Sequence, residues 1–170
     1  MRAFTDEPVD PSAIDRLCWA AQGQTADWGG RTAPSAGASY PLEVTVATSD
    51  ALVRYLPTSH GVRTLRNQDR RQLIAAATGN QEAAVVAPIL FVITGVVART
   101  AGTYGDRAER YVTLEAGHAC QNLLLEATAL GLGAVPIGAF DDEGVRAALR
   151  VGEDELPLYI VPVGHPAPDR

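Results

Sequence analysis

Few residues of this chain have a type and spacing suited to acid, base, nucleophile or metal-ligand chemistry. The three histidines, His60, His118 and His165, are far apart, and none lies in an HExxH or CxxC pattern. No metal site is therefore predicted. Cys18 and Cys120 lie outside the sequence contexts that mark a nucleophile, and no GxSxG turn is present. A reaction here would depend on a cofactor that brings its own reactivity.

Two segments rich in small residues are candidates for binding such a cofactor. They are APSAGASYPLE, residues 33–43, and GLGAVPIGAF, residues 131–140. Small side chains let a flat or anionic group lie against the main chain. The second segment begins like a dinucleotide fingerprint, but Pro136 stands where the third glycine should be and a helix is expected before it. Flavin chemistry fits better, because it asks the protein mainly for backbone donors and for cations near the phosphate.

Predicted helices and strands alternate along the chain and place both segments in connections between them. Periodicity and turn residues predict loops over residues 57–67 and 99–106. The remaining elements form one α+β domain over residues 1–170. The predicted helices are 11–23, 50–56, 69–77, 107–130 and 142–150, and the predicted strands are 42–48, 88–97 and 158–164.

The expected helix ends rest on specific residues. Asp10 before Pro11 is typical of a helix N-cap, and Asp141 is expected to cap the last helix. Gly131 and Gly133 suit a left-handed cap after the longest helix. The strand over 88–97 is apolar on both faces, which predicts a central strand covered on both sides.

The longest predicted helix carries a few polar residues on an otherwise apolar surface. Glu115, His118 and Asn122 follow helical spacing, and Gln121 lies close to them. Buried polar groups need partners. These residues are expected either to bond to each other, to loops or to a twin helix, or to contact a cofactor or substrate directly.

Composition narrows the class of protein. The chain has 170 residues, 14 Lys and Arg against 20 Asp and Glu, and a formal net charge of −6. This balance argues against a nucleic-acid partner. The apolar run 83–98 is short for a membrane span and contains Pro88, and the first ten residues lack a signal-peptide core, so no membrane association is predicted. Two distant cysteines indicate free thiols and a cytoplasmic location.

Several segments, taken in order, resemble the nitroreductase superfamily. They are RAFTDEPV, APSAGASYPLE, YIVPVGHP and, as the long and specific one, YGDRAERYVTLEAGHACQNLLLEATALGLGAVPIGAF. The similarity is greatest to the SagB-type branch, which includes the azoline dehydrogenases of modified-peptide biosynthesis. It covers nearly the whole chain.

The resemblance implies a fold, a cofactor and a reaction. The fold would be α+β and nitroreductase-like, a central mixed sheet flanked by helices in each subunit of a homodimer. FMN would bind at two interface sites and pass hydride through N5 to or from a small-molecule or peptide substrate, with NADH or NADPH as an electron donor. The residues that would lie against the flavin are Pro34, Ser35, Ala36 and Gly37. The loop that would present main-chain amides toward N5 and O4 is formed by Pro136, Ile137, Gly138 and Ala139.

Three further residues are implied as flavin contacts. Gln81 would face the pyrimidine edge, with a surface amide at a helix end as the alternative. Arg2 would contact the phosphate, although of the family pattern R-x-S-x-R-x-F only Arg2 and Phe4 are present. His165 stands where family members often have arginine near the phosphate, with a solvated terminal histidine as the alternative. The upstream phosphate ligands of the pattern are absent, so either the start was truncated, or Arg170, Arg2 and His165 contact the phosphate, or the affinity for FMN is low.

Tyr104 is the one candidate catalytic residue. Azoline dehydrogenases resemble one another in a Lys-Tyr pair, whereas this chain has Thr103 and Tyr104. A lone tyrosine is a weak base near neutral pH. The resemblance as a whole favours an FMN-dependent oxidoreductase of the SagB type. Two alternatives stay open: an azoline dehydrogenase with an altered base, and a non-catalytic flavin-binding or structural partner subunit.

Overall fold

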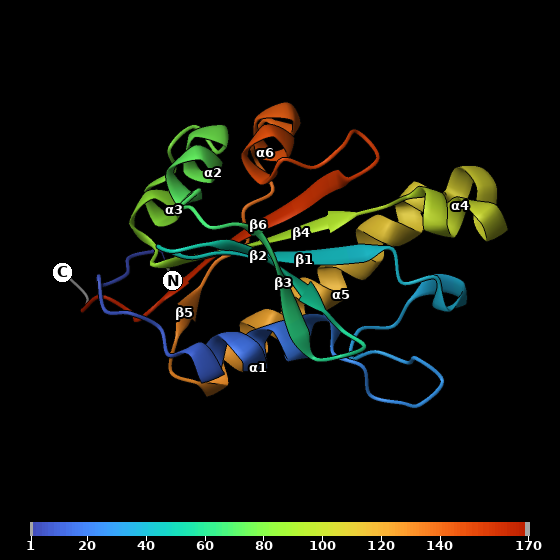
Figure 1. The fold of residues 1–170 in the computed structure, drawn as a ribbon, viewed down its shortest axis with the longest axis horizontal. Coiled ribbons are helices and arrows are strands. Elements are labelled where there is room, and N and C mark those ends of the chain that lie inside the picture. The colour runs from blue at the N-terminus through green and yellow to red at the C-terminus, as the bar shows by residue number, and fades with distance from the viewer. Residues whose placement is uncertain (1, 169–170) are drawn as a thin grey trace.

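Residues 2–168 are described by a computed structural model, so Arg170 lies outside the described residues. Six strands form one sheet in the order β3-β2-β1-β4-β6-β5 (Figure 1). Their bounds are β1 Leu42–Ala47, β2 Leu52–Leu56, β3 Gly61–Arg66, β4 Ile89–Gly95, β5 Gly133–Ala134 and β6 Leu156–Gly164.

All strand pairs in this sheet are antiparallel, which corrects the expectation of a mixed sheet. Short connections explain part of this arrangement. The turn between Thr48 and Ala51 reverses the chain between β1 and β2, with the Thr48 amide donating to the Ala51 carbonyl at 2.9 Å. A short reversal can only make antiparallel neighbours, because parallel neighbours need a long crossover.

Helices cover both faces of the sheet. Figure 1 shows α2, α3 and α6 over one face, α1 and α5 over the other, and α4 at one end. None of the helices in residues 2–168 has the length and apolar character needed to span a bilayer. Their bounds are α1 Pro11–Gln22, α2 Arg71–Ala77, α3 Glu82–Val86, α4 Ala98–Tyr104, α5 Ala108–Ala129 and α6 Asp142–Leu149, with 3₁₀ turns η1 at Ala36–Ala38 and η2 at Gly105–Arg107.

The core has two parts, one on each face of the sheet. Leu17 of α1 and Leu123 of α5 belong to one part, and Ile74 of α2 and Val145 of α6 belong to the other. Strand β4 is buried along its whole length, as its apolar sequence predicted. Gly95 at its end allows α5 to approach closely, because a Cβ there would lie 2.5 Å from Val112 Cγ1.

The predicted helix caps are confirmed. The Ser12 amide donates to Asp10 Oδ1 at 2.7 Å, and the Gly144 amide donates to Asp141 Oδ2 at 2.8 Å. Helix α5 ends before Gly131, which has φ 72° and therefore the left-handed conformation expected of a glycine cap.

Three local predictions were wrong. The 50–56 segment is strand β2 and not a helix, and the 57–67 segment contains strand β3 and not only loop. Residues 98–104 form α4 where a loop was expected. Strand β3 is largely exposed, so its polar residues show no alternation, and β2 buries Arg54 against Glu155. Tertiary contacts decide these segments more than local patterns do.

Candidate functional site

The predicted flavin-contacting segment at residues 34–37 leads into a strained turn. Gly37, Ala38 and Tyr40 have φ values of 60°, 53° and 44°, all in the left-handed region. For alanine and tyrosine this conformation costs roughly 1–2 kcal/mol each. The turn is held by the Tyr40 amide, which donates to Ser35 Oγ at 2.8 Å. Strain that the surroundings maintain in this way is concentrated at functional sites.

Tyr104, the predicted catalytic residue, lies beside this turn at the end of α4. A Cβ added to Gly37 would lie 3.1 Å from Tyr104 Oη. The ring packs edge-on against Tyr111, with centroids 5.0 Å apart. Helix α4 is joined to the turn by the hydroxyls of Ser39 and Thr100, which are 2.8 Å apart. The structure therefore brings Tyr104 to the 34–37 segment.

A cavity of about 280 Å³ lies between the same segment and α5. Glu115 is at its wall with only 3% of its surface exposed, and its Oε1 atom has no hydrogen-bond partner within residues 2–168. Burial raises the pKa of Glu115 to about 7, against the opposing effects of the Ser35 hydroxyl and the Arg31 guanidinium. The lining residues are Pro34, Ser35, Ala36, Tyr111, Leu114, Glu115 and His118.

The other polar residues of α5 have separate surroundings. Asn122 Nδ2 donates to the Thr32 carbonyl at 3.2 Å, so it bonds to a loop, which was one of the expected alternatives. His118 and Gln121 are exposed on the outer face of the helix. Glu115 is thus the polar residue of this seam that is both buried and without a partner for one oxygen.

The second segment, residues 136–139, presents bare main chain. Ile137 anchors it by exchanging hydrogen bonds with Ile160 at 2.8 and 3.0 Å. Gln81 Nε2 donates to the Ala139 carbonyl at 3.1 Å and so fixes the end of the segment. Within the described residues the amides of Gly138 and Ala139 have no acceptor, and a Cβ at Gly138 would meet nothing within 4 Å. The exposed residues are Pro136, Gly138 and Ala139.

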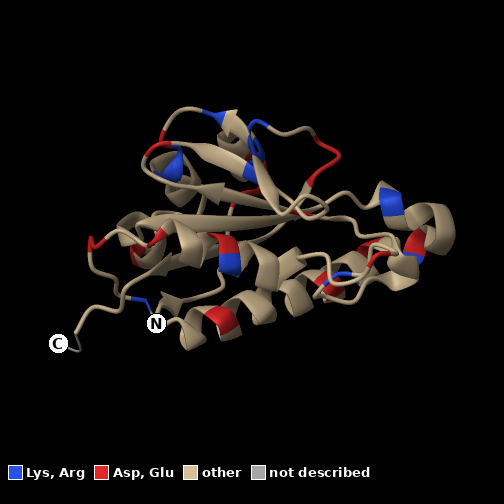
Figure 2. Ribbon diagram, turned by 60° about the horizontal axis from the view of Figure 1, so that its bottom comes forward, with Lys and Arg blue, Asp and Glu red and all other residues tan. Residues whose placement is uncertain are grey.

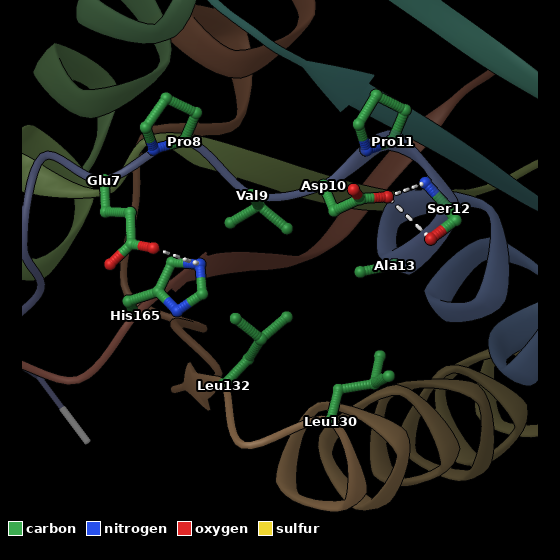
Figure 3. A pocket seen from close by; sticks show the side chains of 10 residues that line it. All are labelled: Glu7, Pro8, Val9, Asp10, Pro11, Ser12, Ala13, Leu130, Leu132 and His165. Atoms are coloured by element: carbon green, nitrogen blue, oxygen red, sulfur yellow. Dashed lines mark hydrogen bonds and ion pairs between the residues drawn. The ribbon is translucent and has the colours of Figure 1, made fainter.

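The predicted phosphate contacts lie where the two ends of the chain meet. Phe4 and Pro166 form an antiparallel bridge, which brings exposed Arg2 and half-buried His165 to the same region. His165 lines a cavity of about 590 Å³ together with Glu7 (Figure 3). Its Nε2 atom is 4.0 Å from Glu7 Oε1, so a protonated His165 would be shared with this carboxylate.

Within one chain these groups do not meet. Ala33, which precedes residues 34–37, packs in the core on the side of α1 and α5. Ile137 packs in the core on the side of α2 and α6. Figure 1 shows the first segment beside α4 and the second between β5 and α6. Gln81 lies with the second segment, Tyr104 with the first, and Arg2 and His165 form a third group.

The sequence reasoning missed Arg31, whereas Glu115 was expected to be a polar residue on a buried helix and is buried. The Arg31 guanidinium lies 4.6 Å from the centroid of the Tyr40 ring and donates to Gln22 Oε1 at 2.9 Å. Burial lowers its pKa, and the charges of Glu43 and Glu115 oppose this shift. A signal for Glu115 was present, since it is the only Asp, Glu, Lys or Arg between Arg110 and Glu126.

The cysteines take no part in these groups. Burial raises the pKa of Cys18 to about 12 and that of Cys120 to about 11. Both thiols are free and stay protonated near neutral pH, so neither is activated as a nucleophile.

Comparison with known proteins gives the family. The sequence profile of the nitroreductase family matches residues 1–165, so the chain belongs to this family. A protein of Methanocaldococcus jannaschii that carries the name nitroreductase is 36% identical over 170 residues, covering 96% of this chain and 85% of the relative.

Solved structures share the fold. One named as a nitroreductase of Ralstonia eutropha JMP134 has a TM-score of 0.90 and 29% identity, covering 99% of this chain and 79% of that chain. Another, named as a nitroreductase of Desulfovibrio desulfuricans in complex with FMN, has a TM-score of 0.74 and 24% identity, covering 99% of this chain and 81% of that chain. The nitroreductase-like α+β fold predicted from the sequence is confirmed.

Proposed function

We propose that this protein is an FMN-dependent oxidoreductase of the SagB-type branch of the nitroreductase family, which transfers hydride to or from an organic substrate. The observation that carries the proposal is the pair of unpartnered amides at Gly138 and Ala139, in an exposed segment with no side chain over Gly138. Such donors stabilise negative charge that develops on a bound ring. The FMN complex of the Desulfovibrio protein, which shares the fold, is consistent with this cofactor.

The residues present fit FMN in chemical type. The backbone donors at Gly138 and Ala139 suit the edge of the flavin at N5 and O4, and Gln81 would keep their segment in place through the Ala139 carbonyl. The small residues of 34–37 would lie against the ring, and Arg2 with His165 would contact the phosphate. Bound FMN would supply the hydride chemistry, with NADH or NADPH as electron donor. No activated nucleophile is needed for this role.

A homodimer would bring the two segments together. They lie on different faces of the sheet in one chain, so we propose that the 34–37 turn of one protomer meets the 136–139 segment of its partner. The outer face of α5 supports this arrangement, because Leu114 and Leu125 are 54% and 61% exposed and flank His118 and Gln121 at helical spacing. Two free, buried cysteines favour the proposed cytoplasmic location.

Tyr104 would act on the substrate. Its hydroxyl lies next to the Gly37 backbone, where a small-molecule or peptide substrate on the flavin face would be within reach. A tyrosine there can donate a hydrogen bond to the substrate and hold a proton near the reacting atom. This position keeps an azoline dehydrogenase with an altered base as a special case of the proposed function.

The test is an absorption spectrum of the purified protein titrated with FMN, followed by addition of NADH or NADPH. We expect bands of bound oxidised flavin that bleach with the nicotinamide and recover with an electron acceptor. Tyr104→Phe should bind FMN as the parent does but lower the turnover of substrate about 10- to 100-fold. A colourless dimer that takes up no FMN would refute the proposal and favour the alternative of a structural partner subunit.

A further inference from the structure

Two buried side-chain atoms in residues 2–168 have no hydrogen-bond partner, Gln22 Nε2 and Glu115 Oε1. Both belong to residues near Arg31: Gln22 accepts a bond from it, and Glu115 interacts with its charge. An unsatisfied carboxylate oxygen is costly in a buried position, because the charged form loses its water without gaining a donor. Such a group is kept in a protein when another requirement outweighs this cost.

Burial and the neighbouring groups have opposing effects on the protonation of Glu115. The Arg31 guanidinium favours the charged form of Glu115, but burial lowers the pKa of Arg31, and its charge also interacts with Glu43. The Ser35 hydroxyl also favours the charged form. The titratable and charged groups that face this region are Arg31 from the loop after α1, Tyr40 and Glu43 at the start of β1, Arg99 from α4, and Tyr111 and His118 from α5.

Glu115 lies against the segment that the proposed function places under the flavin. Ser35 and Ala36 of that segment line the same cavity as Glu115. Tyr104 flanks the segment next to Gly37, and Glu115 flanks it next to Ser35. Charge that develops on a ring held by this segment would therefore act on Glu115, whose burial leaves it only weakly screened by solvent.

We propose that Glu115 takes up a proton when flavin bound at this site is reduced. The inference rests on the proposed function. Reduction adds two electrons and one proton to the oxidised ring, so the reduced ring carries one negative charge. A second proton, from solvent, binds the Glu115 carboxylate and gives the neutral acid. Nearby negative charge disfavours a carboxylate, and Oε1 has no donor to offset the effect. Because burial already holds the pKa of Glu115 at about 7, a modest further rise suffices near neutral pH.

The decisive measurement is the midpoint potential of the FMN-loaded protein as a function of pH from 6 to 9, for the parent and for Glu115→Gln. The glutamine variant keeps the shape of the side chain but cannot titrate. Between pH 7 and the higher pKa that Glu115 has beside the reduced ring, the parent should take up two protons per two electrons, so that its potential falls with pH up to twice as steeply as that of the variant. His118→Asn, which alters another titratable side chain of the cavity wall, should keep the steep dependence.

A second readout is spectroscopic. The infrared difference spectrum between reduced and oxidised protein at pH 8 should contain a protonated carboxyl band, and Glu115→Gln should lack it. Parallel potential curves for parent and Glu115→Gln, or no carboxyl band in the parent, would overturn the inference while leaving flavin binding intact. Failure to bind FMN at all would instead overturn the proposed function and this inference with it. If Glu115→Gln does not fold, the parent spectrum alone decides.

Discussion

At the scale of single residues, burial, hydrogen bonding and charge all act on the Glu115 side chain. It is 3% exposed, its Oε1 atom is unpartnered, and burial raises its pKa from 4.5 to about 7. A raised pKa means that the folded protein binds this proton more tightly than the unfolded chain does. The stabilising contribution is complete below pH 4.5 and is lost as the pH rises through about 7.

Glu115→Gln should therefore remove a pH-dependent part of the stability. The free energy of unfolding of the variant, relative to the parent, should rise by about 3 kcal/mol between pH 4.5 and pH 8, since each pKa unit corresponds to about 1.4 kcal/mol. Urea unfolding at several pH values measures this difference. The control is Glu109→Gln, an exposed acid on the same helix, whose difference should stay flat. Equal pH dependence for the two variants would contradict the raised pKa.

The sequence predicted part of the candidate site at this scale, and the limit of that prediction is physical. Residues 33–43 and 131–140 could be singled out because their small side chains are visible in the sequence, and the family resemblance narrowed them to 34–37 and 136–139. The lack of a donor for Glu115 could not be predicted, because its neighbours Arg31 and Ser35 lie about eighty residues away and reach it only through the packing of α5 on the loop after α1.

At the scale of elements, the conformation of the turn at Ala36–Ala38 depends mainly on one glycine. Gly37 has φ 60°, and its missing side chain leaves room for Tyr104. Gly102 in the adjacent helix α4 has neither constraint, since a Cβ there would meet nothing within 4 Å. The two glycines thus form a matched pair.

Gly37→Ala should destabilise the protein by about 1–2 kcal/mol, because alanine resists the left-handed conformation, and should displace the Tyr104 hydroxyl. Gly102→Ala should leave stability unchanged or raise it by up to about 1 kcal/mol, because alanine is the better helix former. Thermal or urea unfolding measures both effects, and tyrosine fluorescence reports on Tyr104. Equal effects of the two substitutions would show that the turn does not require a glycine.

The errors in the elements have a common cause. Helices α1, α5 and α6 were predicted because caps and apolar periods are local signals, and their caps are where the sequence placed them. Helix α4 has weak helix formers, and it is held by contacts made elsewhere, such as Thr100 with Ser39. Strand β2 hides its pattern because it buries Arg54, which bonds to Glu155 at 3.2 and 3.0 Å.

At the scale of the whole molecule, charge and apolar surface are distributed differently. Figure 2 shows acidic and basic residues scattered over both layers, with few along the middle of α5. The outer face of that helix carries Leu114 and Leu125, more than half exposed. Exposed apolar surface that adjoins a functional site is typical of an interaction surface, and the proposed homodimer would cover these two leucines. Here Leu114 also lines the cavity beside the 34–37 segment.

Leu125→Glu is therefore expected to separate the proposed homodimer. A charge placed at a self-complementary interface faces its own copy or stays unpaired, which should weaken dimerisation roughly 100-fold or more. Val62→Glu is the matched control, because Val62 is 53% exposed on β3, at the edge of the sheet. Sedimentation velocity over a range of concentrations measures the dissociation of both variants.

Measuring whether FMN stays bound to the protein makes the test specific to the flavin site that the two protomers would share. If each flavin lies between the 34–37 turn of one protomer and the 136–139 segment of its partner, dissociation must release FMN, although Leu125 belongs to neither segment. The visible absorbance that sediments with protein should then fall with the dimer fraction in Leu125→Glu and stay constant in Val62→Glu. A monomeric variant that keeps its FMN would place the whole flavin site in one chain, and a geometry other than the interface would have to join the two segments.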